Sequence, residues 1–180
     1  AMADEGAEMT IVGVGPDGLV DPELVAAAIT DHTVLVSVMA ANNEIGVIQP
    51  LAELGALCRA RGVLLHTDAA QAAGKVPLDV EAMQIDLLSI SGHKMYAPKG
   101  IGALYTRRRP RARLLAEMSG GGQERGNRSG TLPVPMVVAL GEASVVAVSE
   151  MSAEGTRLAG LRTRMLDRLR VDHGDMFVNG

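Results

Sequence analysis

Short apolar runs alternate with stretches of helical spacing along the first two thirds of the chain. Runs at 11–14, 34–39 and 63–66 each end in polar or turn-forming residues, which is typical of strands buried in a sheet. Two more runs, at 86–91 and 102–106, have the same character. These runs predict the strands of one sheet.

Helices are expected between and after these strands. Asp21 is suited to cap a helix N-terminus, with Pro22 at the first helical position. Apolar positions over 50–61 recur at helical spacing, and Gly62 follows as a stop signal. A long helical stretch runs from about 133 to 170. The pattern therefore predicts three helices.

Strands that alternate with helices predict an α/β fold with a mainly parallel sheet and flanking helices. Ligands of such sheets bind outside the carboxyl ends of the strands. Polar clusters follow three of the apolar runs here, at 42–44, 67–71 and 91–94. We expect these clusters to converge at one edge of the sheet.

Composition narrows the class of protein. The 180 residues are 47% hydrophobic and 21% charged, which suits a folded chain with a sizeable core. The net charge of −4 argues against a nucleic-acid partner, because such binders carry a basic footprint. No uninterrupted apolar run reaches the roughly 18 residues of a membrane span, so we expect no membrane partner.

Two further features favour structural roles. Cys58 lies on the apolar stripe of the 50–61 helix, so it is expected to be a small buried residue rather than a nucleophile. A single cysteine cannot form an internal disulfide, which favours a reducing compartment. The arginines at 107, 108, 109, 111 and 113 are expected on an exposed strand end and loop, with contact to phosphate or RNA as the alternative.

Lys94 and Asp68 are the leading candidates for chemistry. Lys94 follows a predicted strand and precedes a loop; a lysine in such a cleft can titrate far below its usual pKa of about 10.4 and become an amine nucleophile. Asp68, at another strand end, could hold a proton on a heterocyclic nitrogen, as pyridoxal phosphate requires. The alternatives are a solvated surface lysine and a helix-capping or turn aspartate.

Several hydroxyl, imidazole and amide groups could complete such a site. Ser91, His93 and Thr131 could donate to phosphate oxygens. Gln71 and Asn43 could bond a ring oxygen of the cofactor. Each also has a structural alternative: a strand-end hydroxyl, a partly buried histidine, a helix cap or a turn amide.

Other kinds of site fail on spacing. The glycines at 13–15 lack the third glycine of a dinucleotide-binding loop, and those at 120–122 lack the Lys-Ser or Lys-Thr of a P-loop. The four histidines are scattered without the spacing of metal ligands, so no metal site is expected.

Five segments together closely resemble a known family. These are Asn-Asn-Glu-Ile-Gly at 42–46, His-Thr-Asp-Ala-Ala-Gln at 66–71, Ser-Ile-Ser-Gly-His-Lys at 89–94, Gly-Gly-Gly-Gln-Glu-Arg-Gly at 120–126 and Arg-Ser-Gly-Thr at 128–131. In order and spacing they resemble the group I cysteine desulfurases, which are fold-type I, class V pyridoxal phosphate enzymes. That family supplies sulfur for iron–sulfur clusters and tRNA thiolation.

The resemblance implies a role for each candidate residue. Lys94 would link covalently to pyridoxal phosphate and shuttle protons, and Asp68 would pair with the pyridine nitrogen of the cofactor. Gln71 would bond its ring oxygen, and Asn43 would lie near that oxygen and the substrate. Ser91 and His93 would hold its phosphate, and Thr131 would reach the phosphate of the neighbouring subunit. The resemblance also implies L-cysteine as substrate, a homodimer, and iron–sulfur scaffold and sulfur-acceptor proteins as partners. The compartment would be the cytoplasm of a bacterium or the mitochondrial matrix of a eukaryote.

The resemblance also predicts how the chain is divided and what it lacks. Residues 1–132 would form part of the large pyridoxal phosphate-binding domain, and 133–180 a long linking helix and the start of a small domain. The family's persulfide-forming cysteine and its substrate-carboxylate arginine would lie downstream, so we expect this stretch alone to be inactive. The alternatives are a non-catalytic fragment that dimerises or binds partners, and another class V enzyme such as a selenocysteine lyase.

Overall fold

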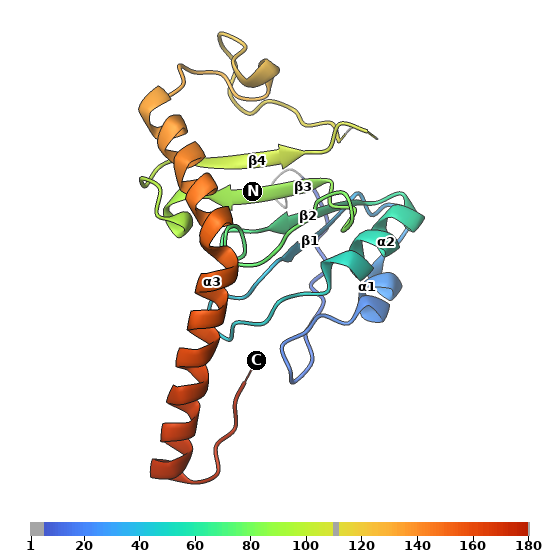
Figure 1. The fold of residues 1–180 in the computed structure, drawn as a ribbon. Helices are drawn as coiled ribbons and strands as arrows, with labels where there is room; N and C mark the ends of the chain where they lie inside the picture. Colours follow the sequence, from blue (N-terminus) through green and yellow to red (C-terminus); the bar gives the residue numbers. More distant parts are fainter. Residues whose placement is uncertain (1–5, 110–111, 180) are drawn as a thin grey trace.

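A mixed sheet of four strands forms the centre of the fold. The computed structural model describes residues 6–109 and 112–179. The strands follow one another across the sheet in chain order: β1 (Leu35–Met39), β2 (Leu64–Asp68), β3 (Leu87–Ser91) and β4 (Gly102–Thr106). The first three are parallel and β4 is antiparallel to β3 (Figure 1). The prediction of an α/β fold with a mainly parallel sheet is confirmed.

Among the described residues, three α-helices and two short 3-10 helices accompany the sheet. They are α1 (Pro22–Ala28), α2 (Leu51–Arg61), α3 (Val134–His173), η2 (Gly92–Met95) and η3 (Glu124–Gly126). The expected signals act as predicted: the Asp21 carboxylate accepts a 2.8 Å hydrogen bond from the backbone N–H of Glu23, and Gly62 ends α2 with a left-handed φ of 69°.

One predicted strand is wrong. The apolar run at 11–14 makes only an isolated bridge, between Val14 and Val20, and belongs to no strand in the described part of the chain. Ile11 is 83% exposed. The reason is that a run of apolar residues forms a strand only where a neighbouring strand accepts its backbone hydrogen bonds, and no such neighbour faces this segment among the described residues.

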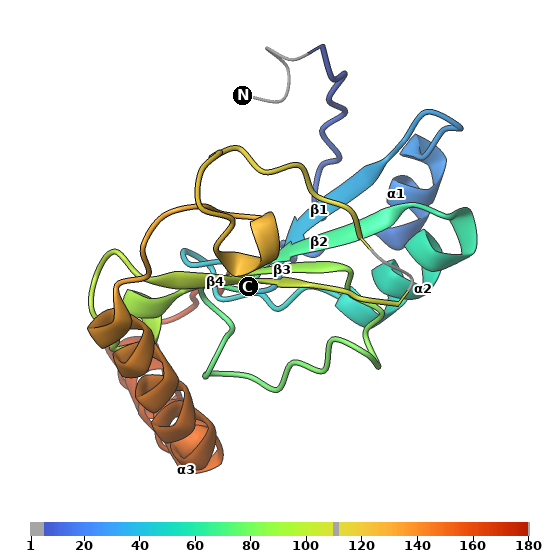
Figure 2. The ribbon, with the colours of Figure 1, turned by 90° about the horizontal axis from the view of Figure 1, so that it is seen from above.

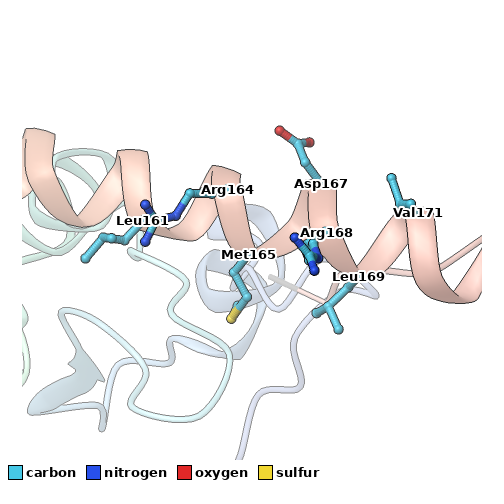
Figure 3. A pocket seen from close by; sticks show the side chains of 7 residues that line it. All are labelled: Leu161, Arg164, Met165, Asp167, Arg168, Leu169 and Val171. Atoms are coloured by element: carbon cyan, nitrogen blue, oxygen red, sulfur yellow. The ribbon is translucent and has the colours of Figure 1, made fainter.

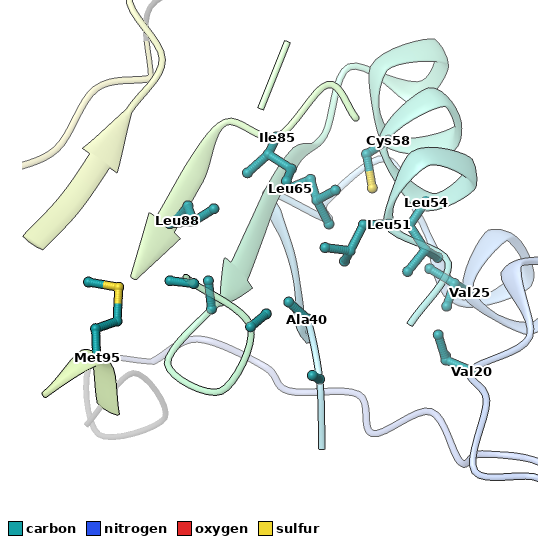
Figure 4. Close-up of a cluster of buried hydrophobic side chains, with 14 residues drawn as sticks. Val20, Val25, Ala40, Leu51, Leu54, Cys58, Leu65, Ile85, Leu88 and Met95 are labelled. Carbon is teal, nitrogen blue, oxygen red and sulfur yellow. The ribbon is translucent and has the colours of Figure 1, made fainter. Parts of the chain in front are cut away.

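The core lies between one face of the sheet and the helices α1 and α2 (Figure 4). Leu54, Leu65 and Ile85 are fully buried there. Cys58 is also fully buried, which confirms its expected structural role, and this burial, followed by the charge of Asp86, raises the pKa of its thiol to about 11. Gly55 lets α2 lie close to the backbone at Met83, because a Cβ atom at position 55 would collide with the carbonyl oxygen of Met83.

The prediction that the whole arginine run is exposed is wrong for its first member. Arg107 is only 6% exposed, and its Nε lies 3.2 Å from Oδ1 of Asp86. The antiparallel pairing of β4 with β3 brings the end of β4 beside Asp86, which precedes β3, and there the guanidinium also donates to the carbonyl oxygens of Ile85 and Val80. Residues 108, 109 and 113 are exposed as expected, and Arg111 lies outside the described residues.

Helix α3 stands beside the end of the sheet that is remote from α1 and α2 (Figure 1, Figure 2). None of its residues is fully buried. It contains an 18-residue window of mean hydropathy 1.5 with at most two charged side chains, so by length and composition alone it could cross a membrane. Polar and charged residues such as Glu142 and Ser144 interrupt the window, so it contains no uninterrupted apolar run of that length. A single helix of this kind is a weak indication, and we infer no membrane partner from it.

Candidate active site

The carboxyl ends of β1, β2 and β3 lie at one edge of the sheet, on the side of η2 and α3 (Figure 1). The segments that leave these three ends carry Asn43, the Asp68 and Gln71 pair, and the group from Ser91 to Lys94. Parallel pairing therefore brings six of the seven candidate residues to the same edge.

Asp68 occupies the middle of this edge. It is in register with Met39 of β1 and Ser89 of β3. Its carbonyl oxygen accepts a 2.8 Å hydrogen bond from the N–H of Ala40, and the N–H of Ala69 donates to Ser89 at 2.9 Å. The end of β2 is thus tied to both neighbouring strands just where its carboxylate emerges.

The carboxylate of Asp68 is oriented but still open to a ligand. Its Oδ1 accepts a 2.8 Å hydrogen bond from the N–H of Ala70, which is the turn role foreseen as the alternative. The side chain is exposed, and Oδ2 accepts no hydrogen bond from the residues that the structure describes. One oxygen therefore fixes the carboxylate while the other remains available to a ring N–H.

The segment after β3, η2, is fixed by its two buried end residues, Gly92 and Met95. Gly92 is buried, and a Cβ atom there would lie 2.8 Å from the carbonyl oxygen of Ile101. Met95 is 7% exposed and packs in the core, so η2 is held down at both ends while His93 and Lys94 between them are exposed. This arrangement presents an imidazole and an amine at the edge of the sheet.

Ser91 and His93 are already paired with each other. The Ser91 hydroxyl lies 3.0 Å from Nδ1 of the His93 ring. Since this contact uses Nδ1, the Nε2 atom of His93 is directed to other partners. Either His93 donates to an anionic oxygen through Nε2–H, with the Ser91 hydroxyl donating to Nδ1, or Ser91 donates while Nδ1 carries the proton; both donate when the ring is an imidazolium.

The neighbouring residues Asn42 and Asn43 have different roles. Asn42 shapes the turn, because its Oδ1 accepts hydrogen bonds from the N–H groups of Glu44 at 2.8 Å and Ile45 at 3.0 Å. Asn43 is exposed after β1, which leaves its amide available at the same edge.

Thr131 is not brought to the other six residues within this chain. It is exposed between η3 and α3, and this segment lies beyond the edge strand β4 (Figure 1). The loop around it is internally bonded: Gly122 N–H donates to the Ser129 hydroxyl at 3.3 Å and Gly130 N–H to Oε1 of Gln123 at 2.9 Å.

Two polar residues near the edge have contacts that the sequence did not reveal. The ring of His66, on the same face of β2 as Asp68, bonds the hydroxyl of Ser37 at 2.8 Å and that of Ser89 at 2.9 Å. Burial lowers the pKa of this imidazole, against the raising effect of Asp68. Lys75 donates to Oε1 of Gln71 at 3.1 Å. The spacing of four residues between Gln71 and Lys75 was the only available signal for the second contact.

Neither a metal cluster in the described part of the chain nor a surface hollow on α3 offers an alternative site. Within residues 6–109 and 112–179, no group of three or more His, Cys, Asp or Glu side chains could hold a metal ion. A hollow beside the last turns of α3 is lined by Leu161, Arg164, Met165 and neighbouring residues (Figure 3). It contains none of the candidate residues.

Comparison with known proteins supports the resemblance to cysteine desulfurases. The family model described as "Aminotransferase class-V" matches residues 1–171. The cysteine desulfurase IscS of Tolumonas auensis is 56% identical over 179 residues, which are 99% of this chain and 44% of that protein. The chain therefore spans less than half the length of such curated relatives.

Solved structures give the same result. A "NifS-like protein" superposes with a TM-score of 0.91 and 35% identity, over 99% of this chain and 49% of that one. "SspA in complex with cysteine" superposes with a TM-score of 0.76 and 42% identity, over 79% of this chain and 41% of that one. Class V aminotransferases and cysteine desulfurases are pyridoxal phosphate enzymes, so the expected cofactor is that of the matched proteins.

Proposed function

The chain belongs to the aminotransferase class-V family, and from this premise we propose that the protein containing it is a pyridoxal phosphate-dependent cysteine desulfurase. The observation that carries the proposal is that Asp68 ends β2 and Lys94 lies in η2, directly after the neighbouring parallel strand β3, so both lie at the same edge of the sheet. The identity of 56% to an IscS protein supports the choice of desulfurase within the family.

The chemistry of the side chains fits this cofactor. When bound, pyridoxal phosphate supplies an electron sink for bond changes at the substrate's α-carbon. Lys94 would bind it covalently through Nζ and move a proton to or from that carbon. Asp68 would hold the proton on the ring nitrogen through Oδ2, because its Oδ1 is engaged by Ala70.

The remaining candidates would fix the cofactor's other groups. Ser91 and His93, already within hydrogen-bond distance of each other, would donate to the phosphate. Gln71 would bond the ring oxygen, and Asn43 would lie near that oxygen and the substrate. We assign Thr131 to the phosphate site of a second subunit, in keeping with the position of its segment, between η3 and α3, beyond β4 (Figure 1).

The biological setting follows from the same proposal. L-cysteine would be the substrate, and alanine and persulfide sulfur the products, with sulfur passed to iron–sulfur scaffold and other acceptor proteins by a homodimer. Residues 1–132 would belong to the large domain and 133–180 to the linking helix and small domain. The bacterial origin of the IscS relative supports the bacterial cytoplasm over the mitochondrial matrix.

Trapping of the cofactor tests the site. The chain is mixed with pyridoxal phosphate, reduced with borohydride and digested, and the modified lysine is located by mass spectrometry. Only three lysines are present, so Lys75 and Lys99 serve as internal controls. We expect the pyridoxyl group on Lys94; its appearance on Lys99 in preference to Lys94 would refute the assignment.

A second candidate function, a non-catalytic module, is favoured for this stretch of chain alone. Its only cysteine is Cys58, which is fully buried and has a thiol pKa raised to about 11, so it cannot serve as the sulfur-accepting thiolate. We expect the isolated 180 residues to release no sulfide from cysteine in the presence of a reductant. The full-length protein assayed with cysteine and selenocysteine separates a desulfurase from a selenocysteine lyase.

A further inference from the structure

The turn that follows Asp68 is a rigid support for two polar side chains. The N–H of Ala73 donates to the carbonyl oxygen of Ala69 at 2.8 Å, and the N–H of Lys75 donates to that of Ala72 at 3.0 Å. These bonds fix the backbone between Gln71 and Lys75. The contact between their side chains, with Nζ 3.1 Å from Oε1, therefore joins two points of one ordered turn.

Gly74 packs this turn against the segment that carries Lys94. Its φ of +73° is left-handed, and a Cβ atom there would lie 2.8 Å from Cβ of Ala147 and 3.1 Å from Sδ of Met95. Met95 is the residue after Lys94. The absence of a side chain at 74 thus lets the Gln71 turn lie against η2 and α3 together.

This packing brings the ammonium groups of Lys75 and Lys94 close enough for their positive charges to interact. Burial, and then the positive charge of Lys94, lower the pKa of the Lys75 ammonium. The hydrogen bond that Nζ of Lys75 donates to Oε1 of Gln71 is strongest in the protonated form of the lysine.

The chemistry of the two side chains fixes the direction of the Gln71 amide. A lysine ammonium has three donors and no acceptor, so it can bond only the oxygen of an amide. The Nε2 atom of Gln71 must then face away from Lys75. The cation also polarises the amide, and this makes the N–H groups on Nε2 better donors.

We propose that Lys75 is a positioning residue of the cofactor site: by holding Oε1 of Gln71, it turns the amide N–H of Gln71 toward the ring oxygen of pyridoxal phosphate. The inference rests on the proposed function, which gives Gln71 that partner. Without Lys75, the amide would rotate and would present its oxygen to the ring oxygen in part of the molecules. Two acceptors would then face each other.

The first experiment needs no cofactor. The side-chain amide of Gln71 is observed by ¹⁵N NMR in the wild-type chain and in Lys75→Met, Lys75→Arg and Lys99→Met. We expect the Gln71 NH₂ signals to move in Lys75→Met and to return toward their original positions in Lys75→Arg, which is also a pure donor. They should stay in place in the control Lys99→Met, which removes a lysine that is likewise exposed but does not bond Gln71. Unchanged Gln71 signals in Lys75→Met would overturn the proposal.

The second experiment links the contact to the cofactor. Lys75→Met should weaken pyridoxal phosphate binding by about tenfold and shift the absorption maximum of the bound ring, with Lys75→Arg recovering most of the affinity. Gln71→Ala should weaken binding less in the Lys75→Met background than in the wild-type chain, because part of the contribution of Gln71 is already lost there. Fully additive losses would refute the positioning role. Failure of the wild-type chain to bind at all would count against the proposed function, while the Gln71 signals would still decide the contact.

Discussion

Replacement of Asp86 by asparagine tests the ionic cluster that joins β2, β3 and β4. Asp86 is 4% exposed; its Oδ2 accepts a 2.9 Å hydrogen bond from the N–H of Leu65, and its Oδ1 lies 3.2 Å from Arg107 and 3.3 Å from Arg59. Asparagine keeps the shape and, with its amide oxygen toward Leu65, the bond to Leu65, but it removes the charge and turns an NH₂ group toward Arg107 and Arg59. The change therefore removes both the charge and the acceptor that the two arginines face.

The cost follows from what remains around Arg107. Breaking a buried ion pair by neutralising one partner costs about 3–5 kcal/mol, because the other charge stays buried. Arg107 keeps its hydrogen bonds to the carbonyl oxygens of Ile85 and Val80 and its contact with the exposed carboxylate of Glu81 at 3.2 Å. We therefore expect Asp86→Asn to lower the free energy of unfolding by about 3 kcal/mol, the lower end of that range.

Chemical denaturation followed by circular dichroism measures the loss. Glu154→Gln is the matched control, since it removes one charge from an exposed pair with Arg157 and should leave the unfolding free energy unchanged. Adding Arg107→Met to Asp86→Asn should restore part of the lost stability, because no buried guanidinium is then left without its carboxylate, whereas Arg59 is 31% exposed and reaches solvent. A loss in Asp86→Asn no larger than that of the control would show that the cluster contributes little and that our account of Arg107 is wrong.

Three further predictions concern the core and a helix cap. Gly55→Ala should destabilise the chain by more than about 1 kcal/mol in the same denaturation assay, because the new methyl group would collide with the Met83 carbonyl, a backbone atom that cannot rotate away. Cys58 should react with iodoacetamide at pH 8 only when the chain is unfolded, and rapid alkylation of the folded chain would contradict its burial. Because folding favours the protonated thiol, the stabilising contribution of Cys58 should be complete below about pH 9 and lost as the pH rises toward about 11. Asp21→Ala should cost about 1 kcal/mol, and Asp21→Asn much less, because asparagine also accepts from the N–H of Glu23.

The elements that were predicted well have strong local signals. Helix α2 begins and ends within a residue of its expected bounds, since Gly62 provides the left-handed residue that ends it. Strand β4 spans 102–106 as predicted, and its antiparallel direction is compatible with the connection at 92–101, which contains η2 but no crossover helix. Local chemistry decides such boundaries, and it can be read without knowledge of distant partners.

The errors arise where distant residues decide the outcome. The run at 11–14 has the composition of a strand, but the backbone around it offers no neighbour in the described structure. Arg107 belongs to a basic stretch that looks solvated, yet β4 places it beside Asp86, twenty-one positions earlier. Neither the missing partner of the first segment nor the buried partner of the second can be inferred from spacing along the chain.

The candidate site combines both situations. Polar clusters that follow parallel strands must meet at one edge, so topology alone was sufficient to bring Asp68 and Lys94 to the same place. Lys75 escaped notice because its significance depends on Gly74, which packs the Gln71 turn against Met95 through a contact between residues twenty-one positions apart. A sequence can therefore reveal which side chains carry chemistry at such an edge, whereas the residues that orient them become visible only when the packing of the intervening turn is known.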